Sequence, residues 1–496
     1  MSTGTLYGVG LGPGDPELMT VKAARLISEA SVIAYHCARH GRSIARSVAE
    51  PYLREGQVEE KLVYPVTTET TDHPGGYEGA IADFYELSAK RLAEHLDAGR
   101  DVVVLCEGDP FFYGSYMYMH ERLSGRFPAV VVPGVTSVSA ASSVLGRPLV
   151  QRDEVLTILP GTLPAPELAR RLADTDAAAV LKLGRTFGSV REALAEAGKL
   201  DDAFYIERAT WGEQRISPLA DVDPSTVPYF SLALLPSPAY ASRQSPVVSP
   251  PVDSSGGEVV VVGLGPAGPE WLTPEASAEL SAVDHVVGYG PYVARVPQKA
   301  GQQRHASGNR VEADRARDAL SLAASGARVA VVSSGDPGVF AMASAVLEQV
   351  SSGHGAGVRV RIVPGVTAAQ AAASRVGAPL GHDYCVLSLS DRLKPWEIIE
   401  KRLDAAGAAD LVLALYNPAS RTRTTQLADA RSVLLRHRAP STPVVVARDV
   451  GGPEEDVRIT TLGDLDPSTV DMRCLLIVGS SRTRAENGIV WTPRSY

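Results

Sequence analysis

Short runs of apolar residues, each closed by glycine or proline, alternate along this chain with longer stretches in which apolar residues recur every three or four positions. The run 101–106, for example, leads into Glu107-Gly108-Asp109-Pro110, whereas helical spacing covers residues 77–96 and stops at Gly99. Continuous apolar runs are typical of buried parallel strands, and the spaced pattern is typical of amphipathic helices. The alternation predicts an α/β fold.

The same glycine and proline motifs occur twice along the chain. A glycine turn stiffened by proline, then Gly-Asp-Pro, then Pro-Gly-Val-Thr appear in one order in both halves, each directly after an apolar run. Matched motifs in one order predict two tandem copies of one unit, and each copy divides into two α/β lobes near the helix after Pro-Gly-Val-Thr. The motifs occupy residues 7–20, 108–110 and 133–136 in the first copy and 261–273, 335–337 and 364–367 in the second.

A segment of different composition separates the copies. Residues 236–257 contain five prolines and six serines and little periodic apolar signal, which is typical of an extended linker. We therefore expect a first domain at 1–235, a Pro/Ser-rich linker at 236–257 and a second domain at 258–496.

Composition narrows the classes of protein. The 496 residues are 45% hydrophobic and 21% charged, as in ordinary soluble proteins, and the formal net charge of -9 argues against nucleic acid as the main partner. No apolar run approaches the ~20 residues of a membrane span. Cys37, Cys106, Cys385 and Cys474 lie far apart, without the paired spacing of a disulfide framework or a zinc ribbon. We expect a cytoplasmic protein with no bound metal and no membrane partner.

The repeated motifs are placed where ligands bind. Each follows a predicted strand, and ligands of open α/β sheets bind at the carboxyl ends of strands. Gly263, Gly265 and Gly268 form a literal Gly-x-Gly-x-x-Gly, but a dinucleotide site also needs an acidic residue at the end of the second strand, and residues 35–37 and 288–290 provide none. The carboxylate of Gly-Asp-Pro suits a cationic or hydroxyl-rich ligand. Pro-Gly-Val-Thr adds a hydroxyl and free amides at a helix start.

In this order the three motifs resemble those of the tetrapyrrole (corrin and porphyrin) methyltransferases, which bind S-adenosylmethionine between two α/β lobes. The resemblance covers both copies and implies two such units, each with its cofactor cleft between the lobes. The first copy is similar to the precorrin-2 C20-methyltransferases, through residues 107–113, 207–210 and 229–231. The second is similar to the precorrin-3B C17-methyltransferases, through residues 308–310, 312, 315–316, 334–338 and 416–420.

The resemblance implies a bifunctional enzyme of cobalamin biosynthesis that methylates precorrin-2 at C20 and precorrin-3B at C17, the latter with ring contraction. It also assigns cofactor positions, which differ at two places: Ala267-Gly268 replaces Gly14-Asp15, and Leu183 aligns with Asn417. The implied positions are Pro13, Gly108, Asp109, Phe112, Thr136, Ser137 and Leu183 in the first copy, and Pro266, Gly335, Asp336, Val339, Thr367, Ala368 and Asn417 in the second, with Cys474 a weaker candidate.

No catalytic side chain is assigned, because a sulfonium methyl is already activated and needs mainly in-line positioning in a dry cleft. Ring contraction requires proton removal from a substrate hydroxyl. His305 and Glu312 are candidate bases, although a substrate contact or a surface position suits each of them better. We expect arginines to recruit the acidic precorrin, since a guanidinium binds a carboxylate through two hydrogen bonds. The candidates are Arg310, Arg421 and Arg448.

Two other classes of protein remain open at this point: an NAD(P)-dependent oxidoreductase and a non-catalytic ligand-sensing duplex. The assembly is open as well. Homologues of each half usually act as homodimers, so the halves either pair with each other as an internal pseudo-dimer or pair like with like in a homo-oligomer. Tethering raises their effective concentration to roughly millimolar, which favours the internal pair.

Overall fold

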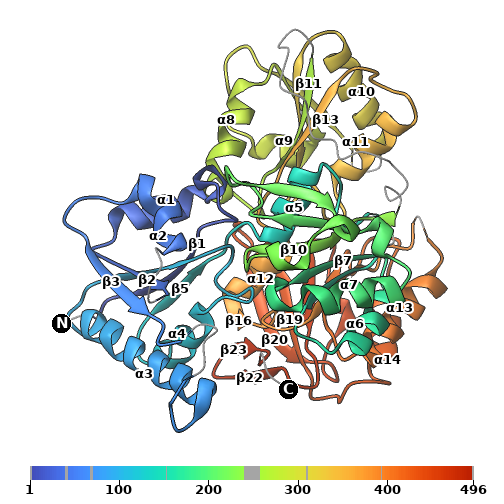
Figure 1. Ribbon diagram of the computed structural model, residues 1–496. Helices are drawn as coiled ribbons and strands as arrows, with labels where there is room; N and C mark the ends of the chain where they lie inside the picture. The colour runs from blue at the N-terminus through green and yellow to red at the C-terminus, as the bar shows by residue number, and fades with distance from the viewer. Residues whose placement is uncertain are drawn as a thin grey trace. The chain divides into compact units, whose positions relative to one another are not determined.

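The computed structural model describes residues 3–38, 43–66, 71–151, 154–238, 257–308, 311–392 and 394–493. The chain forms two compact units, Met1–Thr136 and Ser137–Tyr496, each of which is described by itself (Figure 1). The division falls directly after the first Pro-Gly-Val-Thr motif, where the sequence predicts a boundary between lobes. Of the expected linker, residues 239–256 lie outside the described ranges.

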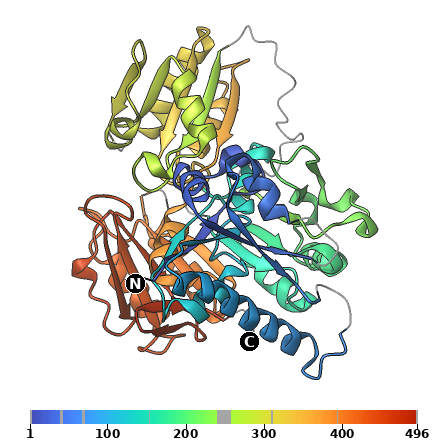
Figure 2. The ribbon, with the colours of Figure 1, turned by 90° about the vertical axis from the view of Figure 1, so that its left-hand side faces the viewer.

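The first unit is built on a parallel sheet of five strands in the order β3-β2-β4-β1-β5. Helices α1 and α2 cover one face, where they pack on Val9, Ile33 and Val103, and α3 and α4 lie on the opposite face (Figures 1 and 2). The elements are β1 (Leu6–Gly10), α1 (Val21–Glu29), β2 (Val32–Cys37), α2 (Ile44–Ala49), β3 (Val58–Val63), α3 (Gly76–Asp97), β4 (Val102–Cys106), α4 (Tyr116–Leu123) and β5 (Ala129–Val132).

Local sequence explains how the first strand connects to its helix. The Thr20 hydroxyl accepts a hydrogen bond from the Ala23 backbone N–H at 3.1 Å and so caps α1. On the other face of the sheet, the Tyr116 ring lies directly over Gly8, at a place where a Cβ would overlap it. Strand β1 is therefore held between helices on both faces, and its carboxyl end is left to the glycine turn.

The second copy repeats this lobe within the second unit. Its parallel sheet has the order β13-β12-β14-β11-β15, which is the order of the first sheet position by position. Helices α8 and α9 pack on one face, and α10 and α11 on the other (Figure 1). The predicted duplication is confirmed. The elements are β11 (Glu258–Gly263), α8 (Pro274–Ala282), β12 (His285–Tyr289), α9 (Gly290–Arg295), β13 (Gln303–Ser307), α10 (Glu312–Ala324), β14 (Arg328–Ser333), α11 (Met342–Ser351) and β15 (Arg359–Val363).

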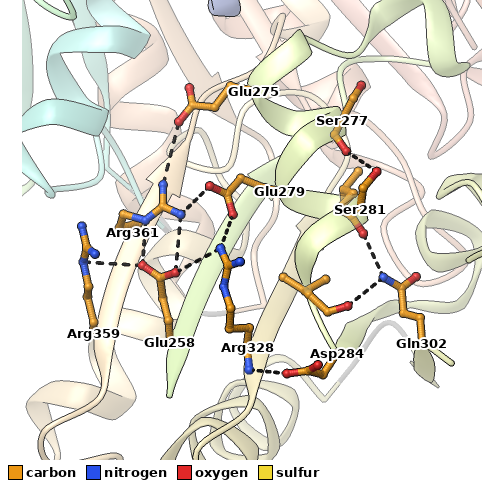
Figure 3. A network of polar contacts seen from close by, with 12 residues as sticks. Glu258, Glu275, Ser277, Glu279, Ser281, Asp284, Gln302, Arg328, Arg359 and Arg361 are labelled. Atoms are coloured by element: carbon orange, nitrogen blue, oxygen red, sulfur yellow. Dashed lines mark hydrogen bonds and ion pairs between the residues drawn. The ribbon is translucent and has the colours of Figure 1, made fainter. Parts of the chain in front are cut away.

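A network of ion pairs holds the amino-terminal edge of this second sheet (Figure 3). Arg361 of β15 binds Glu258 of β11 at 2.7 Å and Glu279 of α8 at 2.6 Å. Arg328 of β14 also binds Glu279, at 3.0 Å, and Arg359 approaches Glu258 at 3.5 Å. Because several charges share partners, the network is worth more than isolated surface pairs. It stabilises the sheet at the edge opposite the glycine turns.

The second lobes of the two copies form one sheet of ten strands in the order β20-β19-β21-β18-β17-β6-β7-β10-β8-β9. Reading outward from the centre, β17-β18-β21-β19-β20 repeats β6-β7-β10-β8-β9. The strands are β6 (Leu156–Pro160), β7 (Ala177–Leu181), β8 (Phe204–Glu207), β9 (Arg215–Pro218) and β10 (Ser231–Leu235) from the first copy, and β17 (Tyr384–Ser388), β18 (Val412–Tyr416), β19 (Pro443–Arg448), β20 (Asp456–Thr461) and β21 (Cys474–Val478) from the second.

The two copies join at β6 and β17, which are antiparallel with Thr157 opposite Cys385. The register runs symmetrically about this pair, because Leu156 faces Val386 and Ile158 faces Tyr384. The arrangement is that of a twofold interface between equivalent surfaces. The internal pairing that the tether favours is therefore present within the chain, whereas assembly of several chains stays a prediction.

Four helices cover one face of the ten-stranded sheet: α6 (Ala165–Ala173), α7 (Phe187–Glu196), α13 (Trp396–Ala408) and α14 (Gln426–Leu434) (Figure 1). Helix α12 (Ala368–Val376) lies on the other face. Its Gln370 donates a hydrogen bond to the hydroxyl of Tyr384, whereas the next residue of β17, Cys385, points to the opposite face, into the core formed with α13 and α14. The remaining strands, β16 (Gly377–Ala378), β22 (Arg484–Glu486) and β23 (Ile489–Trp491), form a small sheet.

The predicted fold class is confirmed. Residues 208–214 connect β8 and β9 as a hairpin in which Glu207 faces Arg215. In the described ranges, none of the helices combines the length and apolar character that a membrane crossing needs.

Candidate functional site

In the first unit the three repeated motifs meet at the carboxyl edge of the sheet. The backbones of Gly12 and Gly108 exchange two hydrogen bonds, from Gly108 N to Gly12 O at 2.8 Å and from Gly12 N to Gly108 O at 3.3 Å. Gly134 of the third motif packs so closely that a Cβ there would overlap the Gly108 carbonyl oxygen. The turn after β1, the loop after β4 and the turn after β5 therefore form one backbone surface, as their strand-end positions predict.

The second copy reproduces this arrangement. Gly335 N donates to Gly265 O at 2.8 Å, and Gly265 N donates to Gly335 O at 3.2 Å. A Cβ on Gly365 would lie 2.5 Å from the Gly335 carbonyl oxygen. Three glycines in equivalent places thus allow three loops to approach one another in both copies.

The Gly-Asp-Pro glycine differs from its packed neighbours. Gly108 has a φ of 66°, and a Cβ placed on it would meet nothing within 4 Å. Gly335 has a φ of 69°, and its Cβ would come no nearer than 3.8 Å to the Ala368 amide. Open space beside a glycine backbone is what a ligand needs in order to contact backbone atoms directly.

The aspartate of the same motif ties the loops together. Asp109 is 3% exposed, and its two carboxylate oxygens accept backbone hydrogen bonds from Phe111 at 2.9 Å and Gly134 at 3.1 Å. Burial raises the pKa of Asp109 to about 7, against the pull of these two amides. The side chain therefore orders the loops around the open space, in addition to any contact with a ligand.

Asp336 has the same role in the second copy. It is 4% exposed and accepts hydrogen bonds from Gly338 N at 2.8 Å and Gly365 N at 3.2 Å. Burial raises its pKa to about 6, opposed by the two amides and by a hydrogen bond from the Ser139 hydroxyl. Ser139 belongs to the first sequence copy.

The two copies support their turns with different side chains. In the first copy the Glu107 carboxylate accepts a hydrogen bond from Ala45 N, at the start of α2, at 3.1 Å. In the second copy Arg295, at the end of α9, donates to Ser334 Oγ at 3.0 Å and to Gly265 O at 2.8 Å, and it also reaches the Leu264 and Ala267 carbonyl oxygens. Sequence reasoning missed Arg295, because it lies about thirty residues from the turn and in no motif.

The predicted residues of the second copy gather around the start of α12. The Thr367 hydroxyl accepts a hydrogen bond from Gln370 N at 3.2 Å and caps the helix. The hydroxyl of Tyr416, at the end of β18, accepts from Ala369 N at 3.2 Å and also bonds Thr367. Asn417, the next residue, has a φ of 51° and donates from Nδ2 to Ser388 Oγ at 3.0 Å. The second lobe thus reaches the helix start that follows Pro-Gly-Val-Thr.

Other predicted cofactor positions lie nearby. Pro266 is in the turn directly after Gly265, and Val339 donates its backbone N–H to Asp336 O at 3.3 Å. Cys474, at the start of β21, donates its thiol to Asp471 Oδ1 at 3.4 Å, and burial raises its pKa to about 11. In the first copy, five of the predicted positions belong to the first unit, whereas Ser137 begins α5 (Ser137–Leu145) and the buried Leu183 follows β7 in the second unit.

The predicted substrate arginines differ in their surroundings. Arg310 lies outside the described residues, and Arg421 is exposed. Arg448 is paired with Asp471 at 2.9 Å and with Glu454 at 2.9 Å. Buried Arg423, which sequence reasoning did not select, donates to Asn417 O at 2.9 Å and holds the loop that contains Arg421.

The two candidate bases belong to different elements, β13 and the start of α10. His305 lies in the middle of edge strand β13 and its ring nitrogen meets that of His285 at 3.0 Å, and burial lowers its pKa. Glu312 is exposed at the start of α10. Within the described part of the chain, no three His, Cys, Asp or Glu side chains gather closely enough to hold a metal ion.

The fold and site define a class: a duplicated α/β protein in which each copy builds a glycine-lined, backbone-rich site at the carboxyl edge of its first sheet. The model of the family described as Tetrapyrrole (Corrin/Porphyrin) Methylases matches residues 5–223 and 258–466. The chain belongs to this family.

Relatives match at full length and by halves. The chain is 61% identical over 501 residues to the cobalamin biosynthesis protein CobIJ of Mycobacterium tuberculosis (strain H37Rv), covering 99% of this chain and 96% of the relative. A precorrin-2 C(20)-methyltransferase from Sinorhizobium sp is 52% identical and covers 48% of this chain and 96% of its own length. A precorrin-3B C(17)-methyltransferase from Sinorhizobium sp is 45% identical and covers 48% of this chain and 97% of its own length.

Proposed function

We propose that this chain is a bifunctional, S-adenosylmethionine-dependent methyltransferase of cobalamin biosynthesis. The N-terminal half methylates precorrin-2 at C20, and the C-terminal half methylates precorrin-3B at C17 with ring contraction. The observation that carries the proposal is the repeated site, because each half builds the same backbone surface and each half is matched by a methyltransferase of one of these two kinds.

The residues of each site fit the cofactor. Open space beside Gly108 and Gly335 allows a ligand to reach backbone atoms, and the two buried aspartates fix the surrounding loops. S-adenosylmethionine supplies an activated methyl group on a sulfonium centre. The protein then has to hold an electron-rich macrocycle carbon in line with that methyl and exclude water. We propose as cofactor positions the residues that the motifs assign, beginning with Pro13, Gly108 and Asp109 in the first copy and Pro266, Gly335 and Asp336 in the second.

For the acidic precorrin we retain the arginines as candidate partners, with an order of preference. Arg421 is exposed, so its guanidinium is available to a substrate carboxylate. Arg448 would have to exchange Asp471 and Glu454 for the substrate, which makes it the weaker candidate. We place the enzyme in the cytoplasm, where its four buried thiols stay reduced.

Titration calorimetry with S-adenosylhomocysteine tests the proposal. The intact chain should bind two equivalents, and Asp109→Ala and Asp336→Ala should each remove one site and spare the other, since distant sites act independently. Transfer of a labelled methyl group should then require the first site for precorrin-2 and the second for precorrin-3B. Binding of a nicotinamide cofactor in place of S-adenosylhomocysteine would favour an oxidoreductase, and binding without transfer a ligand-sensing protein. Neither alternative has support from the family match.

A further inference from the structure

The site of the second copy is contacted by the first copy. Val150, which precedes β6 in the first copy, forms a bridge with Val339 beside the second Gly-Asp-Pro. Val150 N donates to Gly338 O at 3.3 Å, and Phe340 N donates to Val150 O at 3.4 Å. These bonds add a short stretch of the first copy alongside the loop that carries Asp336.

Helix α5 of the first copy makes the other contacts. The Ser143 hydroxyl donates to Ile362 O, near the end of β15, at 2.5 Å. One turn earlier, the Ser139 hydroxyl bonds the Asp336 carboxylate. Ser142 lies close as well, since a Cβ on Gly338 would be 3.2 Å from Ser142 Oγ and 3.1 Å from Asp336 Oδ1. Ser139 and Ser142 are 3% and 1% exposed, so these contacts are fully buried.

Ser139 has no counterpart in the second copy. It stands three residues after Thr136, and the residue three after Thr367 in the second copy is Gln370. Gln370 donates from Nε2 to the Tyr384 hydroxyl of its own copy at 3.2 Å. Ser139 therefore has a contact that duplication of the motif alone does not explain.

We infer that the N-terminal half completes the second methyltransferase site, with Ser139 as a positioning residue that holds the Asp336 carboxylate against the amides of Gly338 and Gly365. The inference rests on the proposed function of the second half. It makes the second activity depend on a residue of the first half that touches neither substrate nor cofactor.

The charge state of Asp336 gives the hydroxyl a measurable effect. A hydroxyl donor favours the ionised carboxylate, which can accept from both backbone amides at once. Among the residues that the structure describes, Tyr416 also faces Asp336, and burial raises the pKa of Tyr416 to about 12, so it stays neutral near pH 7. Asp109, whose pKa is about 7, accepts from the equivalent pair of amides, so without Ser139 we expect the pKa of Asp336, about 6, to rise towards that of Asp109.

The test is Ser139→Ala in the full chain, with Asp109→Ala in the background so that calorimetry with S-adenosylhomocysteine reads the second site alone. If the pKa rises from about 6 to about 7, the ionised fraction at pH 6 falls from about one half to about one tenth, so affinity should drop about fivefold. At pH 8 the same change should alter affinity by less than about 1.2-fold. Ser143→Ala, which loses a contact to Ile362 but none to Asp336, is the matched control and should leave the pH profile unchanged.

The outcomes separate the two proposals. Ser139→Ala with Asp109 intact must still bind at the first site, which reports a folded chain. If affinity at the second site is unchanged from pH 6 to pH 8, or changes equally in Ser143→Ala, Ser139 has no positioning role. If the unsubstituted chain binds no S-adenosylhomocysteine, the proposed function itself is wrong.

Discussion

Two arginines reach across the join between β6 and β17 from equivalent places. Arg171 of α6 binds Asp383, which precedes β17, and Arg402 of α13 binds Asp176, which precedes β7, at 2.8 Å. The pairs differ in burial. The side chains of Arg171 and Asp383 are 5% and 1% exposed, whereas those of Arg402 and Asp176 are 19% and 25% exposed.

The difference in burial predicts that replacing Arg171 lowers the stability of the fold more than replacing Arg402. Burial raises the pKa of Asp383 although His382 and Arg171 both pull it down, so desolvation exceeds the attraction. Arg171→Met leaves that carboxylate buried without its cation, which should cost about 3–5 kcal/mol. Arg402→Met is the matched control, since its partner keeps access to water and the loss should be about 1 kcal/mol or less.

Hydrogen–deuterium exchange of peptides that cover β6 and β17 measures the effect where it occurs. A loss of 3 kcal/mol raises exchange by a factor of about 150, and larger losses raise it further. Arg171→Met/Asp383→Leu removes both charges and fills the volume, so exchange should return to the rate of the unsubstituted chain or below it. A single variant whose exchange rises less than about fivefold, or a double variant as labile as the single one, would refute the argument from desolvation.

Two further predictions concern the sites. The pKa of Asp109 in the folded state, about 7, exceeds the unfolded value of 3.8, so the stabilisation from its proton is complete below pH 3.8 and lost as pH rises through about 7. Between pH 4 and pH 8, the free energy of unfolding of Asp109→Asn should therefore increase by about 4 kcal/mol relative to that of the unsubstituted chain. Hydrogen–deuterium exchange of β1 and β4 measures this difference, and a difference that stays constant with pH would contradict the prediction. Arg295→Met frees three backbone carbonyls of the second turn and should weaken S-adenosylhomocysteine binding there at least about tenfold, with the first site as control. Calorimetry that finds both sites unaffected would show that the turn does not need the arginine.

The convergence of the three motifs could be predicted from sequence, because each motif directly follows a strand. Three motifs that each follow a strand of one parallel sheet must lie on one edge, and glycines mark the places of closest approach. The two α/β lobes of each copy could be predicted in the same way, from the alternation of apolar runs with stretches of helical spacing. The shared ten-stranded sheet could not be predicted, since β6 and β17 are both continuous apolar runs and nothing in such a run identifies its neighbour.

The side-chain partners were the hardest part to predict. Arg448 was a candidate for binding the substrate, yet its partners Glu454 and Asp471 come from the turn that follows and from a segment 23 residues further on. Arg295 reaches the second turn only through the packing of α9 against the sheet. Contacts of this kind depend on tertiary geometry, and spacing along the chain carries no signal for them.

The differences between the copies separate the features of the two candidate sites that have changed from those that have stayed. Asp15 caps a short 3₁₀ helix (Pro16–Leu18) by accepting from Glu17 N at 2.9 Å, and the second copy forms the equivalent helix (Pro269–Trp271) with Gly268 in its place. Likewise Glu107 in one copy and Arg295 with Ser334 in the other hold the same paired turns. The side chains that support the turns have changed while the exchange of hydrogen bonds between the two glycine loops has stayed. That pattern is expected if the ligand is bound chiefly by backbone atoms, because any set of side chains that fixes the same backbone then serves equally well.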